Sequence, residues 1–267
     1  MTSRETILES EHLKEIDGHY ELTGQFPAFT IPATLQDSLM ARLDRLMTAK
    51  GIAQLGAVIG RQFSYELLHA ISQLEEDTLH RELSRLVEAE LLYQQGLPPQ
   101  GIYTFKHALI RDAAYQSLLK RTRQHYHQKI AQILAEMFVE TAENQPELLA
   151  YHLTEAGLVE QAVVLWYKAG AKASERSAYV EAIVHLRKGL ELLQLLPETP
   201  ARDRHELLLQ CTLAASLTAT KSYTAPEVGQ TYTRAYQLCQ QIGETPELFS
   251  VLGGCPRINV NSLLISS

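Results

Sequence analysis

Apolar residues recur at helical spacing along most of this chain, starting near residue 31. The first such stretch places four leucines on one face of a helix, at spacings of four, four and three residues: Leu35, Leu39, Leu43 and Leu46. The same period predicts three further helices, over residues 52–59, 65–71 and 75–90, and Ser64 is placed to cap the second of these. This part of the chain is therefore expected to be helical.

The period then changes, and two short segments have the composition of β-strands. Residues 91–95 and 102–106 flank the loop GLPPQG, whose glycines and prolines favour a turn. The two segments predict a β-hairpin. Helices followed by a hairpin are typical of a winged-helix module, and we expect one over residues 31–120, because Ile31-Pro32 keeps the chain extended before the first helix.

Beyond the hairpin the pattern predicts helices only. EQAVVLW at 160–166 and VEAIVHL at 180–186 share a small residue, two β-branched residues and a bulky one at matching offsets, which lets two helices pack closely. Their offset of 20 residues is shorter than the 34 of a tetratricopeptide repeat, so we interpret them as consecutive helices of one hairpin. We expect a tetratricopeptide-like array over residues 121–252.

Prolines mark where the later helices of this array begin, since proline is tolerated in a first helical turn. The expected helix starts are Pro200, Pro226 and Pro246. Residues 253–267 lose the helical period and are left unassigned. The expected fold class is mainly α: a winged-helix module with a short β-hairpin, followed by a tetratricopeptide-like α-helical hairpin array.

Composition and charge exclude several classes of protein. The 267 residues carry a net charge of −7, which disfavours binding to nucleic acid or to an anionic membrane. No apolar run approaches the roughly 20 residues needed to cross a bilayer, and charges interrupt the N-terminus before a secretory apolar core could form. The three cysteines share no metal-like spacing and are expected to be reduced thiols. We therefore expect a cytoplasmic protein without a membrane partner.

The sequence contains no local motif for catalysis. It has no glycine loop to cradle phosphate, no Ser-His-Asp or Cys-His arrangement and no metal-ligand spacing. His125 and His127 are two residues apart, so on a helix they point in different directions and make poor joint metal ligands. We therefore predict that this chain is not an enzyme and holds no metal or cofactor of its own.

His107 is the histidine whose position favours a specific role. It lies where the strand predicted over 102–106 runs into a helix. Backbone N–H groups at a helix N-terminus favour an anion such as phosphate, to which an imidazole could also donate. A structural histidine with satisfied hydrogen bonds is the alternative, and the residues alone leave both readings open.

Basic and aromatic side chains are candidates for docking a partner. The basic candidates form either a solvated helix face or a face for an acidic partner: Lys120, Arg121 and Arg123. The aromatic candidates are either core residues or part of a groove for a peptide or helix: Trp166, Tyr167 and Tyr179. Helical repeat arrays commonly bind protein or peptide partners in such grooves.

Five segments, in this order, resemble a known family: IPATLQDSLMARLDRL, IGRQFSYELL, LVEAELLY, YTFKHALIRDAAYQSLL and LLAYHLTEAGLVEQAVVLWYKAG. They are similar to the large bacterial predicted ATPases of the signal-transducing (STAND) class, many of which are fused to an adenylate or guanylate cyclase domain. That class arranges a cyclase or kinase module, a P-loop ATPase, a winged helix and tetratricopeptide-like repeats along the chain. The resemblance runs from about Thr6 to Leu252.

The resemblance implies a regulatory role within a nucleotide switch. Residues 1–30 would be a remnant of the ATPase lid, and ATP or ADP would bind an upstream P-loop domain that is a partner of this chain. Phe105-Lys106-His107 matches the place where related switch ATPases have a histidine that contacts bound ADP. His107 is thus a nucleotide-sensing candidate in the intact protein, and the repeats would bind an inducer protein or peptide.

Two alternatives stay open. A stand-alone transcriptional regulator would place the helix predicted over 75–90 in the DNA major groove, but its six carboxylates against two arginines would repel a polyphosphate. The other alternative is a non-functional gene fragment. Under the resemblance itself the P-loop and cyclase domains would lie before residue 1, and the family's repeats would continue past residue 252, where this sequence departs from the family pattern.

Overall fold

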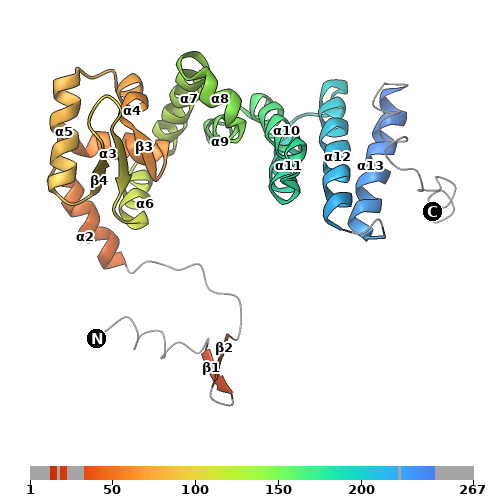
Figure 1. Ribbon diagram of the computed structural model, residues 1–267, viewed down its shortest axis with the longest axis horizontal. Helices are drawn as coiled ribbons and strands as arrows, with labels where there is room; N and C mark the ends of the chain where they lie inside the picture. Colours follow the sequence, from red (N-terminus) through yellow and green to blue (C-terminus); the bar gives the residue numbers. More distant parts are fainter. Residues whose placement is uncertain (1–12, 17–18, 23–32, 222–223, 244–267) are drawn as a thin grey trace.

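The computed structural model describes residues 13–16, 19–22, 33–221 and 224–243, and most of these are helical. Figure 1 shows an elongated arrangement. A helical module that contains a small sheet lies at one end, and helices α7 to α13 follow one another toward the other end. The prediction of a mainly α fold is confirmed.

A short hairpin precedes the module. Strands β1 (Leu13–Ile16) and β2 (His19–Leu22) pair antiparallel. This hairpin was not predicted from the sequence. Most of residues 1–30, interpreted above as a remnant of an ATPase lid, lie outside the described residues.

The sheet-bearing module contains five helices and three strands. Their bounds are α2 (Ala33–Asp44), α3 (Thr48–Ile59), β3 (Gln62–Ser64), α4 (Tyr65–Ser72), α5 (Glu76–Glu88), β4 (Leu92–Gln95), β5 (Ile102–Phe105) and α6 (Ala108–Gln116). The helices and the β4–β5 hairpin expected here are confirmed. Helix α3 begins four residues earlier than predicted, because Ala49 belongs to its buried face. Ser64 caps α4 as expected, with its Oγ accepting the N–H of Leu67 at 3.2 Å.

Three antiparallel strands form the sheet of the module, in the order β3-β5-β4. Strand β3 was not predicted from the sequence, because three residues are too few to show the alternation of apolar and polar side chains that marks a strand. In the sheet it places Phe63 opposite Tyr103. The ring of Phe63 stacks on that of Tyr103 with centroids 6.0 Å apart and meets Phe105 edge-on at 5.9 Å.

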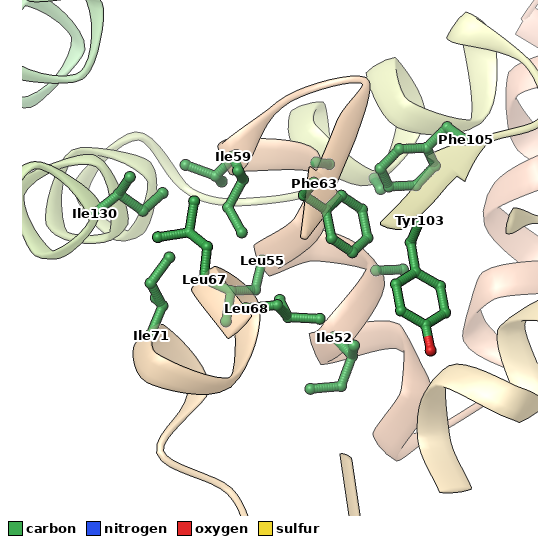
Figure 2. Packing of buried hydrophobic residues seen from close by; sticks show 14 of the residues in the cluster. Ile52, Leu55, Ile59, Phe63, Leu67, Leu68, Ile71, Tyr103, Phe105 and Ile130 are labelled. Atoms are coloured by element: carbon green, nitrogen blue, oxygen red, sulfur yellow. The ribbon is translucent and has the colours of Figure 1, made fainter. Parts of the chain in front are cut away.

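The core of the module lies between this sheet and helices α3 and α4. Figure 2 shows Phe63, Tyr103 and Phe105 facing apolar side chains of the two helices. Gly56 permits the close packing, because a Cβ there would lie 2.7 Å from the ring of Phe63. Ile130 of α7 belongs to the same cluster and is fully buried, so α7 is docked on the module.

The remaining elements of the described residues are all helices, as predicted from residue 121 onward. The helices are α7 (Lys120–Met137), α8 (Val139–Asn144), α9 (Pro146–Ala156), α10 (Val159–Glu175), α11 (Tyr179–Leu193), α12 (Pro200–Thr220) and α13 (Pro226–Ile242). From α9 on, each helix packs against the next. Helices α10 and α11 are the consecutive packed pair that the sequence similarity predicted.

The predicted helix starts are confirmed at two prolines. Pro200 and Pro226 begin α12 and α13, and the hydroxyl of Thr199 accepts the N–H of Arg202 at 3.2 Å. Pro246 and the unassigned tail over 253–267 lie outside the described residues.

Two hydrophobic clusters meet at α10. The first runs from the module through α7 and α9 and ends with Trp166 and Ala169, while the second joins Val163 and Ala173 to α11, α12 and α13. One helix therefore contributes buried residues to both clusters and connects the two ends of the molecule. No helix among the described residues combines the length and apolar character that crossing a bilayer requires.

Candidate functional site

His107 lies on the surface at the junction of β5 and α6. It is the N-cap of α6 in an extended conformation, with φ −133° and ψ 141°, and its side chain is exposed and makes no capping hydrogen bond. The N-terminus of α6 therefore opens to solvent beside an imidazole. An anion supplied from outside the chain could reach both groups.

A lysine adjoins this position. The Nζ of Lys106 lies 4.8 Å from the centroid of the exposed Tyr93 ring and 3.4 Å from a carboxylate oxygen of Glu90. This ammonium group is therefore committed to contacts within the chain, and the exposed groups at this junction are the N-terminus of α6 and the imidazole of His107.

The basic candidates for docking differ in their exposure. Lys120 and Arg121 are exposed in the first turn of α7, where the helix dipole disfavours cations. Arg123 is partly buried, with its guanidinium 5.0 Å from the centroid of the Tyr115 ring. Arg123 is thus committed to a contact within the chain, and Lys120 and Arg121 remain open to a partner.

Trp166 is a core residue, which corrects its use as a docking candidate. Its side chain is only 3% exposed, and its indole N–H donates to the hydroxyl of Thr154 at 3.0 Å. The His185 ring stacks on the Trp166 indole with centroids 5.4 Å apart, and the ammonium of Lys188 lies 4.7 Å from the centroid of the indole. A partner cannot reach an indole that the chain itself covers on these sides.

The tyrosine candidates and the apolar surface lie further along the array. Tyr167 and Tyr179 are partly buried, and Tyr167 packs against the second hydrophobic cluster. The apolar side chains that are open on α11 are Val180, 73% exposed, and Val184, 47% exposed, one helical turn apart. The exposed apolar surface of α11 is therefore made by valines, which the sequence did not single out.

A buried histidine pair lies between α7 and α9, and sequence reasoning missed it. His127 and His152 are both 0% exposed, and their Nδ1 atoms are 2.9 Å apart. As expected, His125 points elsewhere and is exposed. The two histidines are 25 residues apart on different helices, so no local spacing in the sequence marks them as partners.

The pair continues into a chain of polar contacts that reaches the surface. The Nε2 of His127 lies 3.1 Å from the hydroxyl of Tyr115 on α6, and that hydroxyl donates to a carboxylate oxygen of Glu155 on α9 at 3.3 Å. The Nε2 of His152 is buried and has no hydrogen-bond partner. Three helices thus share one polar chain, which ends inside the protein at an unpartnered nitrogen.

Burial controls the protonation of this cluster. It lowers the pKa of His127 to about 4, helped by the guanidinium of Arg123, and that of His152 to about 3, helped by His127. Burial and the carboxylate of Glu155 raise the pKa of Tyr115 to about 12. At neutral pH the histidines and the tyrosine are therefore neutral.

No three His, Cys, Asp or Glu side chains converge to hold a metal ion within the described part of the chain. A comparison with curated proteins finds an uncharacterized protein of Rhizobium meliloti (strain 1021) that is 28% identical over 225 residues. The match covers 83% of this chain but 22% of the relative, so the chain spans about a fifth of the relative's length. No family model matches the chain.

Proposed function

We propose that this chain is the non-catalytic, regulatory and protein-interaction portion of a bacterial STAND-type signalling ATPase or adenylate cyclase. In this proposal residues 31–120 are a winged-helix module and residues 121–252 are tetratricopeptide-like repeats. Binding of a cytoplasmic protein or peptide by the repeats is relayed through the module to an ATP or ADP site in an upstream P-loop domain.

The observation that carries the proposal is the exposed imidazole of His107 at the end of the β4–β5 hairpin. It lies beside the N-terminus of α6 and next to Lys106. Helices followed by such a hairpin support the winged-helix interpretation, although the third strand β3 was not expected. A phosphate group presented by a neighbouring domain would find an N–H-rich helix end and an imidazole together.

Continuous packing supports a relay. The first hydrophobic cluster links the module to α7, α9 and α10, and the second continues from α10 to α13. A partner bound on the array changes the state of the module only if it binds two arrangements of these helices with different affinity. The open valines of α11 and the exposed Lys120 and Arg121 are the surfaces we assign to such a partner.

The length of the relative is compatible with this assignment. Most of the Rhizobium meliloti protein lies beyond the matched fifth and has room for further domains. The proposal needs such a domain, because nucleotide chemistry is assigned to a P-loop unit and not to this chain.

The test begins with the genomic DNA on both sides of the coding region. The proposal expects a P-loop ATPase encoded upstream, in frame or as a neighbouring gene. Co-expression of that ATPase with the chain should give a complex that retains ADP. His107→Ala should lower ADP retention, while His125→Ala, a change of an exposed histidine on α7, leaves it unchanged. Equal retention by both variants, ATP or cyclase turnover by the purified chain alone, or a salt-dependent shift of duplex DNA would each contradict the proposal.

A further inference from the structure

The direction of each hydrogen bond around the histidine pair follows from the acceptor at one end of the series, the carboxylate of Glu155. The carboxylate of Glu155 can only accept, so the hydroxyl of Tyr115 donates to it. That hydroxyl oxygen then accepts from the Nε2–H of His127, which leaves the Nδ1 of His127 as an acceptor. The Nδ1–H of His152 therefore donates to His127 across the 2.9 Å contact.

This assignment explains the unpartnered atom and makes the site responsive to protons. The Nε2 of His152 carries a lone pair and is sealed from solvent without a partner. A proton added there creates a buried cation whose N–H has no acceptor, which is strongly unfavourable. A proton added to His127 instead places an N–H against the N–H of His152.

We propose that the His127–His152 pair is a proton-operated latch between α7 and α9. When both imidazoles are neutral, the hydrogen-bond chain holds α9 against α7 and, through Tyr115, against α6. Protonation of the pair releases α9 and the helices that follow from the sheet-bearing module. The latch is a property of this chain and does not rest on the proposed nucleotide switch.

Neighbouring groups do not supply a counter-charge at the pair. The charged and titratable groups around the pair are Tyr115 of α6, Arg123 of α7, and Tyr151 and Glu155 of α9, while Arg111 of α6 acts on Tyr151. Both arginines are cations. The carboxylate of Glu155 contacts Tyr115 rather than either imidazole. An imidazolium in this position is therefore not paired with an anion.

The sign and size of the effect follow from linkage. In the closed state the two histidines titrate near pH 4 and pH 3, and in an opened state they return toward the ordinary 6.5. The open state therefore binds more protons as the pH falls from about 6.5 toward 4, and acid favours opening. Between pH 8 and pH 5 each histidine raises the opening equilibrium constant about thirtyfold, and the pair together raises it about a thousandfold.

Imidazole nitrogen NMR on the whole chain tests the assignment directly. At pH 8 the proposal expects His127 as the Nε2–H tautomer and His152 as the Nδ1–H tautomer. The reverse assignment, or fast averaging between tautomers at both rings, overturns the proposal. This measurement uses the unmodified protein and does not depend on any variant folding.

Amide hydrogen exchange then measures opening at pH 8 and pH 5, after correction for the intrinsic exchange rates. Amides of α9 should lose protection about a thousandfold, while those of α3 and β5 keep theirs. The double variant His127→Leu/His152→Leu should reduce this pH ratio to less than about threefold, and His125→Gln, an exposed change on the same helix, should retain it. A loss spread evenly over the chain, or an undiminished ratio in the double variant, would overturn the latch.

Discussion

The module at one end and the array α10–α13 at the other are both dominated by helices, yet they are held together differently. In the module, contacts join elements distant in sequence: β3 pairs with β5, and α3 packs against α5, α6 and α7. In the array, the main contacts run from each helix to the next. A structure built from neighbour contacts can come apart in steps, whereas the module should lose its packing as one unit.

The two regions also bury a carboxylate in different settings. Glu82 in the module accepts from Thr48 and Arg85, each at 2.8 Å, and so ties α5 to α3. Glu206 in the array receives two hydrogen bonds from Arg234, at 2.6 and 2.8 Å, between adjacent helices. In both regions a buried charge is retained because it is paired, which agrees with the high cost of an unpaired one.

The largest expected loss of stability comes from truncating a buried side chain, and it tests directly whether the module and the array unfold differently. Phe105→Ala removes a fully buried ring of the module and should lower the free energy of unfolding by about 3–5 kcal/mol. Leu209→Ala in the array should cost about 2–5 kcal/mol, but with exchange protection lost mainly in α11 to α13. Denaturant unfolding with hydrogen exchange checks both. If Leu209→Ala removes protection from β5 as strongly as from α12, the two regions are not independent.

The next largest effect is expected from removing the charge of the buried carboxylate of Glu82. Burial raises the pKa of this carboxyl, but hydrogen bonds from Thr48, Arg81 and Arg85 outweigh burial and hold it below the ordinary 4.5. Its ionised form therefore stabilises the module above pH 4.5, and this contribution is lost as the pH falls below that value. Glu82→Gln should cost about 1.5–3 kcal/mol at neutral pH.

The same variant should show a weaker loss of stability below pH 4.5 than the unmodified chain. Glu88→Gln, an exposed change on the same helix, serves as the control and should alter neither quantity. Denaturant titrations at pH 7 and pH 4 measure both. An identical acid dependence for Glu82→Gln and the unmodified chain would contradict the assignment.

Glycines at close helix contacts sharpen the comparison. A Cβ at Gly56 meets the Phe63 ring at 2.7 Å, and one at Gly170 meets Leu186 at 2.5 Å. Gly56→Ala and Gly170→Ala should each cost about 2 kcal/mol, because Phe63 and Leu186 are both buried and neither side chain has free space to move into. Gly51→Ala, where nothing lies within 4 Å, should stabilise α3 by about 0.5–1 kcal/mol. Thermal unfolding of the three variants gives the order, and a variant at Gly56 or Gly170 that is as stable as Gly51→Ala would contradict the argument.

The smallest losses of stability are expected from the helix N-caps, and they should be equal in the module and in the array. Ser64 caps α4 in the module and Thr199 caps α12 in the array, each by accepting one backbone N–H at 3.2 Å. Ser64→Ala and Thr199→Ala should each lower the free energy of unfolding by about 1 kcal/mol. Ser64→Gly and Thr199→Gly should lower it by only a few tenths of a kcal/mol. A cap acts within its own helix, so a difference above about 1 kcal/mol between the two alanine variants would show that one of them has a further role.

An element could be predicted from the sequence when the interactions that define it join residues close together along the chain. Helices α4, α5, α12 and α13 could be predicted because their period, caps and first-turn prolines are written within a few residues. Strand β3 could not, because a strand of three residues is defined by its partner β5 and not by its own pattern.

The candidate sites show the same division. The place of His107 at a strand–helix junction was predicted correctly from the segment alone, while its role in nucleotide sensing stays a prediction. Trp166 was proposed as a docking residue because an aromatic side chain in a helix does not reveal whether it faces a groove or the core. The structure placed it in the core.

The sequence by itself determined the helical character, the β4–β5 hairpin, the packed α10–α11 pair and the site of His107, because each depends on residues close together along the chain. Only the tertiary structure decided that His127 meets His152, that Tyr115 joins them to Glu155, and that α10 serves two cores. Those contacts depend on how separate helices are brought together. That arrangement is set by the sum of many weak packing contacts, and no short stretch of sequence encodes it.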